Sequence, residues 1–177
     1  IAYTNNEYSN DFNEDESIYY YAIKDAISGK LSESLKKLNS LILKNENNYY
    51  FLETKADILL SYGYKKEALE FYEKILNKHP DNIYIKYNLF INSNFEKKDQ
   101  KSKKNIFLNN INLLYFYSYN RVLISKYLKL SKLLEYSEWN NFFEILLYKK
   151  NEIKKNLIDL DSKTKDTNLK KIIKMYI

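Results

Sequence analysis

The sequence has no cysteine, and among its 177 residues it has one histidine, one proline and two glycines. Without cysteine the chain can form no disulfide, no zinc finger and no thiol nucleophile. The glycines, Gly29 and Gly63, are too far apart for a loop that binds a dinucleotide or a nucleotide phosphate. His79 cannot form a histidine pair for a metal, and beside Pro80 it is expected to be an exposed turn residue. We therefore expect a chain that is not an enzyme, with no catalytic, metal-ligating or cofactor-binding residue.

The net charge is +6, from 29 basic and 23 acidic residues. Every basic residue except Arg121 is lysine, and the abundance of Lys, Asn, Ile, Tyr and Phe is typical of an AT-rich genome. Arginine is the residue that reads phosphates and guanines with two hydrogen bonds, so a scattered lysine surplus favours a solvated surface over a nucleic-acid site. The densest basic run, residues 97–104, is diluted by Asp99 and has no aromatic residue within it, so it is also expected to be surface.

No apolar run approaches the roughly 18 residues that a membrane helix needs, so we expect no membrane insertion. The sequence opens at Ile1 without a signal peptide and is expected to be part of a longer protein. Residues 1–15 are rich in Asn and acids and are expected to be loosely ordered. The acidic cluster there and just beyond is expected to favour a helix N-terminus rather than chemistry, and consists of Asp11, Glu14, Asp15 and Glu16.

The two glycines mark an internal repeat of 34 residues. Residues 22–29 align with residues 56–63, and the following apolar positions keep the same spacing. The second copy predicts helices over residues 49–62 and 65–78, with a glycine in the turn and a proline after them. This order, with a helix, a tight turn, a second helix and then Pro-Asp-Asn, is the tetratricopeptide pattern. Small residues are expected where its helices cross, namely Ala22, Ser34, Ala56 and Ala68. The alternative is a plain helical bundle with coincident glycines.

Beyond residue 82 the helical period continues without this consensus. Helices are predicted over residues 82–93 and 103–113, and apolar stripes mark four more at residues 123–134, 139–147, 153–160 and 169–176. Trp139 lies on one of these stripes and is expected in the core. The prediction is an all-α, tetratricopeptide-like solenoid of about ten helices in five antiparallel pairs. The helices form one domain over residues 16–177. The repeats are regular over residues 15–48 and 49–82, and the helices over residues 83–177 diverge from the repeat consensus.

A set of short segments carries a further signal, namely residues 20–23, 29–31, 41–42, 47–56, 58–59 and Gly63. Together they resemble the C-terminal tetratricopeptide region of M48-family zinc metalloproteases of the alphaproteobacterial type, similar to the beta-barrel assembly-enhancing protease. The corresponding family motif is Asn-Pro-Tyr-Phe-x-Glu-Leu-Lys-Gly-x-Ile-Leu-x-x-x-Gly. This sequence follows the motif except that Tyr49, Thr54 and Ala56 replace its Pro, its Leu and its first Gly. Residues 143–155 are similar to the family's last helical pair in layout.

The resemblance implies an accessory domain of an envelope protease that guides substrates or partners, placed in the periplasm or cell envelope. The family's His-Glu-x-x-His helix is absent from this sequence, so no catalytic or metal residue is carried over. Without the family link, a cytoplasmic location is expected.

Arrays of this kind bind ligands on the face formed by the first helix of each pair. Counting back from Pro80 gives the candidate groove residues, which are Tyr19, Ile23, Tyr50, Glu53, Asp57, Tyr84, Tyr87 and Ile91. Tyrosine suits an interface because it combines apolar area with a hydroxyl and little rotamer entropy. The alternative is that several of these tyrosines only pack between repeats.

The leading hypothesis is a protein–protein interaction domain of an M48-type protease that grips a polypeptide in this groove. A stand-alone repeat adaptor unrelated to proteolysis is the second hypothesis, and an RNA-binding helical repeat is the third.

Overall fold

The computed structural model describes residues 13–46, 48–148 and 152–177. Within these ranges the chain is all-helical and contains no β-strand. The chain divides into two compact units, Ile1–Lys78 and His79–Ile177, and each is described by itself. Of the N-terminal residues 1–15 that are expected to be loosely ordered, residues 1–12 lie outside the described ranges. The last of these residues are ordered, because Asn13 caps the first helix and Glu14 and Asp15 belong to that helix.

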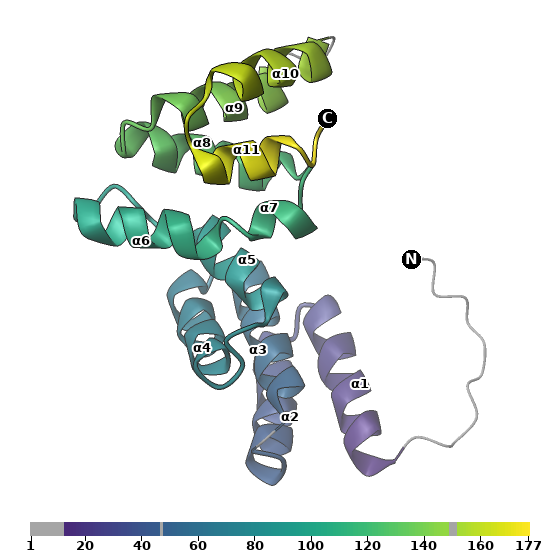
Figure 1. The fold of residues 1–177 in the computed structure, drawn as a ribbon. Helices are drawn as coiled ribbons and strands as arrows, with labels where there is room; N and C mark the ends of the chain where they lie inside the picture. Colours follow the sequence, from purple (N-terminus) through teal and green to yellow (C-terminus); the bar gives the residue numbers. More distant parts are fainter. Residues whose placement is uncertain (1–12, 47, 149–151) are drawn as a thin grey trace. The chain divides into compact units, whose positions relative to one another are not determined.

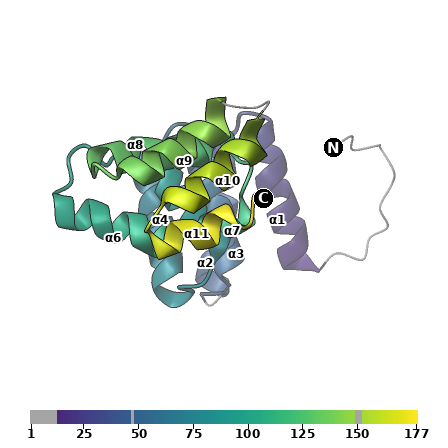
Figure 2. The same cartoon turned by 45° about the horizontal axis from the view of Figure 1, so that its top comes forward.

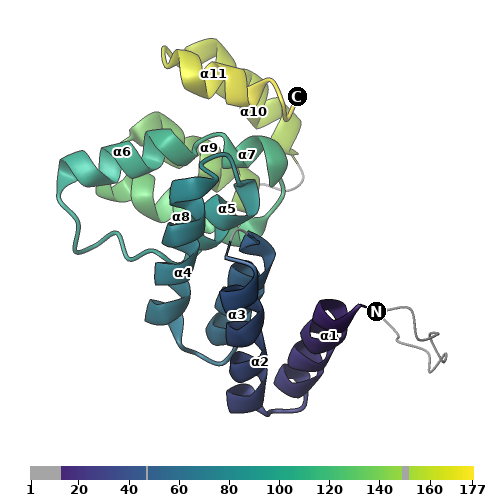
Figure 3. The same ribbon diagram turned by 90° about the horizontal axis from the view of Figure 1, so that it is seen from below.

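The first unit consists of two helical hairpins (Figure 1). Its helices are α1 (Glu14–Ile27), α2 (Leu31–Lys44), α3 (Tyr49–Ser61) and α4 (Lys65–Lys78). The packing is densest between α1 and α2 and between α3 and α4, and α2 also packs against α3. The hairpins therefore follow one another along the chain, with α2 and α3 at their junction, as Figure 3 also shows.

The buried positions of the first unit recur after 34 residues. The small residues at the helix crossings are completely buried, as predicted, and so are the larger residues one and two turns further on. The equivalent pairs are Ala22 and Ala56, Ser34 and Ala68, Leu38 and Tyr72, and Leu41 and Ile75. The 34-residue sequence period is therefore also a period of packing.

The hairpin turns of the first unit have equivalent geometry. Gly29 and Gly63 have φ angles of +82° and +87°, the left-handed conformation that glycine adopts without strain. Each turn is closed by a backbone hydrogen bond of the same kind, from Lys30 N to Asp25 O at 2.8 Å and from Tyr64 N to Leu59 O at 2.9 Å. This is the bond that ends a helix at a glycine, so both glycines stop their helices as predicted.

In the described residues of the second unit, seven helices surround one hydrophobic core. In chain order they are α5 (Ile83–Asn92), α6 (Gln100–Asn110), α7 (Leu113–Phe116), α8 (Arg121–Leu133), α9 (Ser137–Tyr148), α10 (Ile153–Lys163) and α11 (Thr167–Ile173). The helices α8 and α9 make the most extensive pair, and α6, α5 and α10 pack against them. Figure 2 shows α8, α9, α10 and α11 together. Trp139 is buried in this core, as predicted.

Differences from the predicted elements are local. The helix α7 was not predicted, and α6 begins at Gln100 rather than at residue 103 because Asp99 accepts a hydrogen bond from Ser102 N and caps it. The predicted cap Asn82 accepts a hydrogen bond from Ile85 N. Lys103 corrects the expectation of a fully solvated basic run, because its side chain is buried on α6.

Candidate functional site

Five of the eight predicted groove residues lie on α1 and α3 of the first unit. Tyr19 points from α1 to α3, where its hydroxyl is 2.8 Å from Thr54 Oγ1 and its ring is 5.5 Å from that of Phe51. Ile23 follows one turn later on α1 and is half-buried. Tyr50 is 59% exposed and its ring stacks on that of Tyr49 at 4.4 Å. Tyr19 therefore serves packing between hairpins, while Tyr50 presents its side chain to solvent.

The two predicted acidic groove residues are half-buried on α3. Asp57 accepts a hydrogen bond from the hydroxyl of Tyr72, which is completely buried on α4. This bond satisfies the polar end of a buried tyrosine, so Asp57 has a structural role in the second hairpin. Glu53 lies one turn before Asp57 on the same helix.

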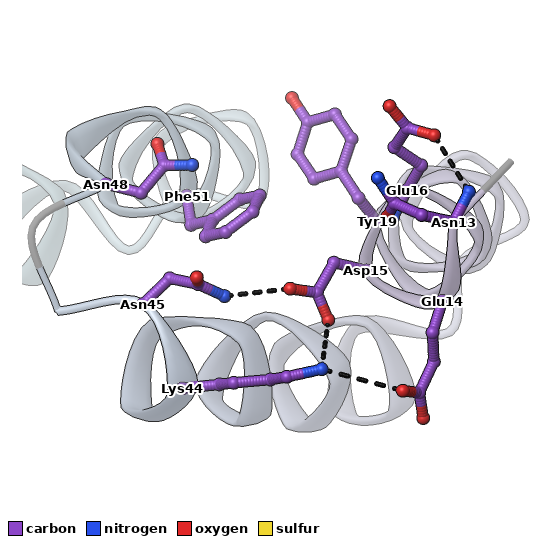
Figure 4. Close-up of a pocket in the computed structure, with 9 residues that line it drawn as sticks. All are labelled: Asn13, Glu14, Asp15, Glu16, Tyr19, Lys44, Asn45, Asn48 and Phe51. Carbon is purple, nitrogen blue, oxygen red and sulfur yellow. Dashed lines mark hydrogen bonds and ion pairs between the residues drawn. The ribbon is translucent and has the colours of Figure 1, made fainter.

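A hollow with a volume of about 480 Å³ lies where the N-termini of α1 and α3 meet the C-terminus of α2 (Figure 4). The rings of Tyr19 and Phe51 line part of it. Its remaining lining is polar or charged and comprises Asn13, Glu14, Asp15, Glu16, Lys44, Asn45 and Asn48. The hollow thus adjoins the predicted groove at its Tyr19 end.

Most polar groups of the hollow bind one another. Lys44 Nζ is 2.7 Å from Asp15 Oδ1 and 3.5 Å from Glu14 Oε2, and Asn45 Nδ2 donates to Asp15 Oδ2 at 3.0 Å. Asn13 and Glu16 form a reciprocal capping box at the start of α1. The hydrogen bonds from Lys44 and Asn45 lower the pKa of Asp15, and the same ion pair raises the pKa of Lys44. The network therefore holds the helix ends together rather than leaving reactive groups poised.

The hollow presents aromatic rings, carboxylates, amides and an ammonium group. Aromatic rings and exposed carboxylates can contact a polypeptide side chain, and a cation over a tyrosine or phenylalanine face gains additional attraction. Glu14 and Glu16 are exposed at the rim, and Tyr50 adjoins Phe51 in the sequence. The acidic cluster lies in the first turn of α1, as predicted for Glu14, Asp15 and Glu16, and Asp11 lies outside the described residues.

The other three predicted groove residues lie on α5 in the second unit. Tyr87 packs against the ring of Tyr117 at 4.5 Å, and its hydroxyl accepts a hydrogen bond from Asn120 Nδ2 at 3.1 Å. Ile91 is partly buried against the core of the unit. Tyr87 and Ile91 therefore pack within the second unit, and we do not propose them as groove residues. Tyr84 is 41% exposed.

His79 is exposed in the segment between α4 and α5, as predicted. Across the described ranges, no three His, Cys, Asp or Glu residues gather in a way that could hold a metal ion. Within those same ranges, none of the helices combines the length and the apolar character needed to cross a membrane.

Over the described residues, the fold and this site define an all-helical chain whose first unit carries a hollow lined by polar side chains and two aromatic rings. Comparison of the chain with protein-family models, with curated proteins and with solved structures finds no match.

Sequence reasoning missed Lys44, Asn45 and Phe51 as lining residues of the hollow. Lys44 meets Asp15 across 29 residues of sequence, and no short-range pattern marks such a pair. Phe51 is one position after the predicted groove residue Tyr50, and successive residues on a helix point about 100° apart, so the prediction named the neighbouring face of α3.

Proposed function

We propose that this protein is a polypeptide-binding helical repeat domain, tetratricopeptide-like in its first unit and non-catalytic. The observation that carries the proposal is the 34-residue recurrence of completely buried positions and of left-handed glycines in α1 to α4. Repeats of helical hairpins present the first helix of each pair as a continuous binding face. Here those helices are α1 and α3. Tyr50 is exposed on α3, and Tyr19 of α1 and Phe51 of α3 line the hollow.

The chemistry of this face supports a polypeptide rather than RNA. The first unit holds 10 of the 29 basic residues and 13 of the 23 acidic residues, a net charge of −3. A phosphate backbone would be repelled by a negative unit. Exposed tyrosine beside half-buried carboxylates suits a peptide with apolar and basic side chains. An RNA ligand would instead need the second unit, whose net charge is +9.

The more specific form of the proposal is that the chain is the accessory domain of an M48-type envelope protease. Its support is the resemblance of residues 47–56 and the phrases around them to that family. The gene upstream of the codon for Ile1 provides the test. A His-Glu-x-x-His helix there supports the protease link, whereas an open reading frame without that helix leaves a stand-alone adaptor, the alternative form of the proposal.

The test of polypeptide binding is a display library of random peptides selected on the full chain. We expect enriched peptides whose binding is lost in Tyr50→Ala and retained in Tyr64→Ala. Tyr64 is a matched control because it is also an exposed tyrosine of the first unit, at the turn before α4. Binding should survive moderate salt, whereas RNA binding would weaken steeply as salt rises.

A further inference from the structure

Several large side chains in and around the link between α7 and α8 are in contact with solvent. Phe116 is 64% exposed, Tyr119 is 77% exposed, and Val122 is also exposed on the first turn of α8. Tyr148, at the end of α9, is 71% exposed. We name these four residues the Phe116 patch. Three of the four lie within seven residues of sequence, and Tyr148 follows Leu147, whose carbonyl oxygen accepts a hydrogen bond from Arg121. Exposed apolar side chains that are grouped on a folded unit mark an interaction surface, and single ones do not.

The backbone beneath the Phe116 patch is held in place by the rest of the second unit. The ring of Tyr119 packs edge-on against that of Tyr176 at 5.6 Å, and the hydroxyl of Tyr176 donates to Ser118 O. The last residues of the chain therefore pack against the segment that leads from α7 into α8. Arg121 Nη2 donates to Leu147 O at 3.2 Å, which joins the start of α8 to the end of α9 beside Tyr148. The patch is therefore preorganised, which lowers the entropic cost of binding.

The stretch of sequence that carries three of the four patch residues is basic. Between Asp99 and Glu135 the sequence has seven basic residues and no acidic one. The whole second unit holds 19 basic and 10 acidic residues, a net charge of +9. A partner that docks here is favoured if it carries negative charge.

The lysines of this stretch do not form a track for a phosphate backbone. Lys129 pairs with Glu96 at 2.6 Å, Lys132 pairs with Glu144 at 2.9 Å, and Lys126 donates to Ser93 O. Next to Val122 lies Arg121, an exposed residue whose guanidinium carries N–H donors in a planar fork that matches a carboxylate. One of these donors, on Nη2, is used by Leu147 O. Apolar anchors with one arginine are typical of a protein interface rather than of a nucleic-acid surface.

We propose that the Phe116 patch is a second docking site, which binds an acidic polypeptide segment. Apolar side chains of that segment cover Phe116, Tyr119 and Val122, and one of its carboxylates pairs with Arg121. The site is separate from the Tyr50 face of the first unit and differs from it in the charge that it selects. The protein would thus hold two polypeptides, or two parts of one.

The test uses the full chain with Tyr50→Ala, so that peptides bound by the first unit are not selected. A display library of random peptides is selected on this protein, and the Kd of an enriched peptide is measured by fluorescence polarisation. We expect peptides rich in Asp or Glu with aromatic or aliphatic residues. Phe116→Ser should raise the Kd by about tenfold or more and Arg121→Lys by about fivefold, because lysine keeps the charge and loses the fork.

Ile158→Ser is the matched control, since Ile158 is an exposed aliphatic residue of the same unit on α10, outside the patch. It should leave the Kd unchanged. The proposal is overturned by enrichment of basic or uncharged peptides, by no enrichment, or by equal effects of Phe116→Ser and Ile158→Ser. It is also overturned if Phe116→Ser abolishes binding to phosphatidylglycerol vesicles, which would make the patch a membrane contact, or converts a dimer to a monomer in sedimentation equilibrium, which would make it a self-association surface.

Discussion

Tyrosine accounts for 19 of the 177 residues, and its positions show how one residue type takes different roles. Tyr72 and Tyr127 are completely buried and donate their hydroxyl hydrogen bonds to Asp57 Oδ1 and Asn110 O. Tyr50 and Tyr119 are mostly exposed. A buried tyrosine needs a partner for its hydroxyl, and an exposed one offers both ring and hydroxyl to a ligand. The candidate binding residues are therefore those tyrosines that the core does not use.

Because Tyr127 is buried, we expect the second unit to lose stability in alkaline solution. Burial raises its pKa above the ordinary value of 10.0, whereas the unfolded chain ionises near that value. The stabilisation is complete below pH 10 and is lost as the pH rises toward the folded pKa, by about 1.4 kcal/mol per pH unit for one tyrosine. Denaturation in urea from pH 8 to pH 11 should show this decline.

Tyr127→Phe should make that decline less steep while lowering stability at pH 8 by about 1 kcal/mol, because Asn110 O loses its hydrogen bond. Burial also raises the pKa of Tyr176, so part of the slope should remain. An unchanged slope in Tyr127→Phe would contradict the assignment.

At the scale of elements, side-chain caps decide where several helices begin. Asn13, Asn48, Asn82, Asn120 and Asp166 each accept backbone hydrogen bonds at the start of a helix. The repeat predicted α3 and α4 to within one residue, because a glycine and Pro80 delimit them. The short helix α7 escaped prediction because four residues give no periodic signal, although it carries Phe116 at the candidate docking surface.

Loss of the Asp166 cap at the start of α11 should measurably lower the free energy of unfolding. Its Oδ1 accepts hydrogen bonds from Asn168 N at 2.8 Å and Leu169 N at 3.0 Å, and its Oδ2 accepts one from Trp139 Nε1 at 2.8 Å. Asp166→Ala removes the cap and leaves a buried indole N–H without a partner, so we expect a loss of about 2–3 kcal/mol.

Asp99→Ala is the matched control, because Asp99 caps α6 without a buried partner of this kind. It should cost about 1 kcal/mol. Urea denaturation followed by the fluorescence of Trp139 measures both variants. Equal losses in the two variants would show that the bond to Trp139 contributes nothing.

For the whole molecule, the main finding is the division of the chain at Lys78 and His79 into units of opposite net charge. The sequence predicted one domain and a lysine surplus spread over the chain. Composition alone averages over both units, so the negative first unit and the positive second unit could not be separated until the boundary was known. The repeat was visible in the sequence because its packing depends on small residues at fixed spacing, whereas the ion pairs of Lys44 depend on distant residues.

Two separate cores predict two separable unfolding transitions. Ala68 is completely buried in the second hairpin, so Ala68→Leu should destabilise the first unit by about 1–3 kcal/mol through overpacking. The chain's one tryptophan, Trp139, lies in the second unit. We expect Ala68→Leu to lower the urea midpoint seen by circular dichroism and to leave the midpoint seen by tryptophan fluorescence unchanged.

Leu43→Ala, an exposed change on α2, should move neither midpoint. If Ala68→Leu shifts both midpoints equally, the two units unfold as one.

The central claim is that the first unit recognises a polypeptide through the face that carries Tyr50. Its most direct test is the Kd of a library-selected peptide for the unmodified chain, for Tyr50→Ala and for Tyr64→Ala at low and moderate salt. The account predicts a rise in Kd of about tenfold or more in Tyr50→Ala, with Tyr64→Ala and the salt series close to the unmodified chain. Equal binding by all three proteins, or binding that disappears as salt rises, would contradict it.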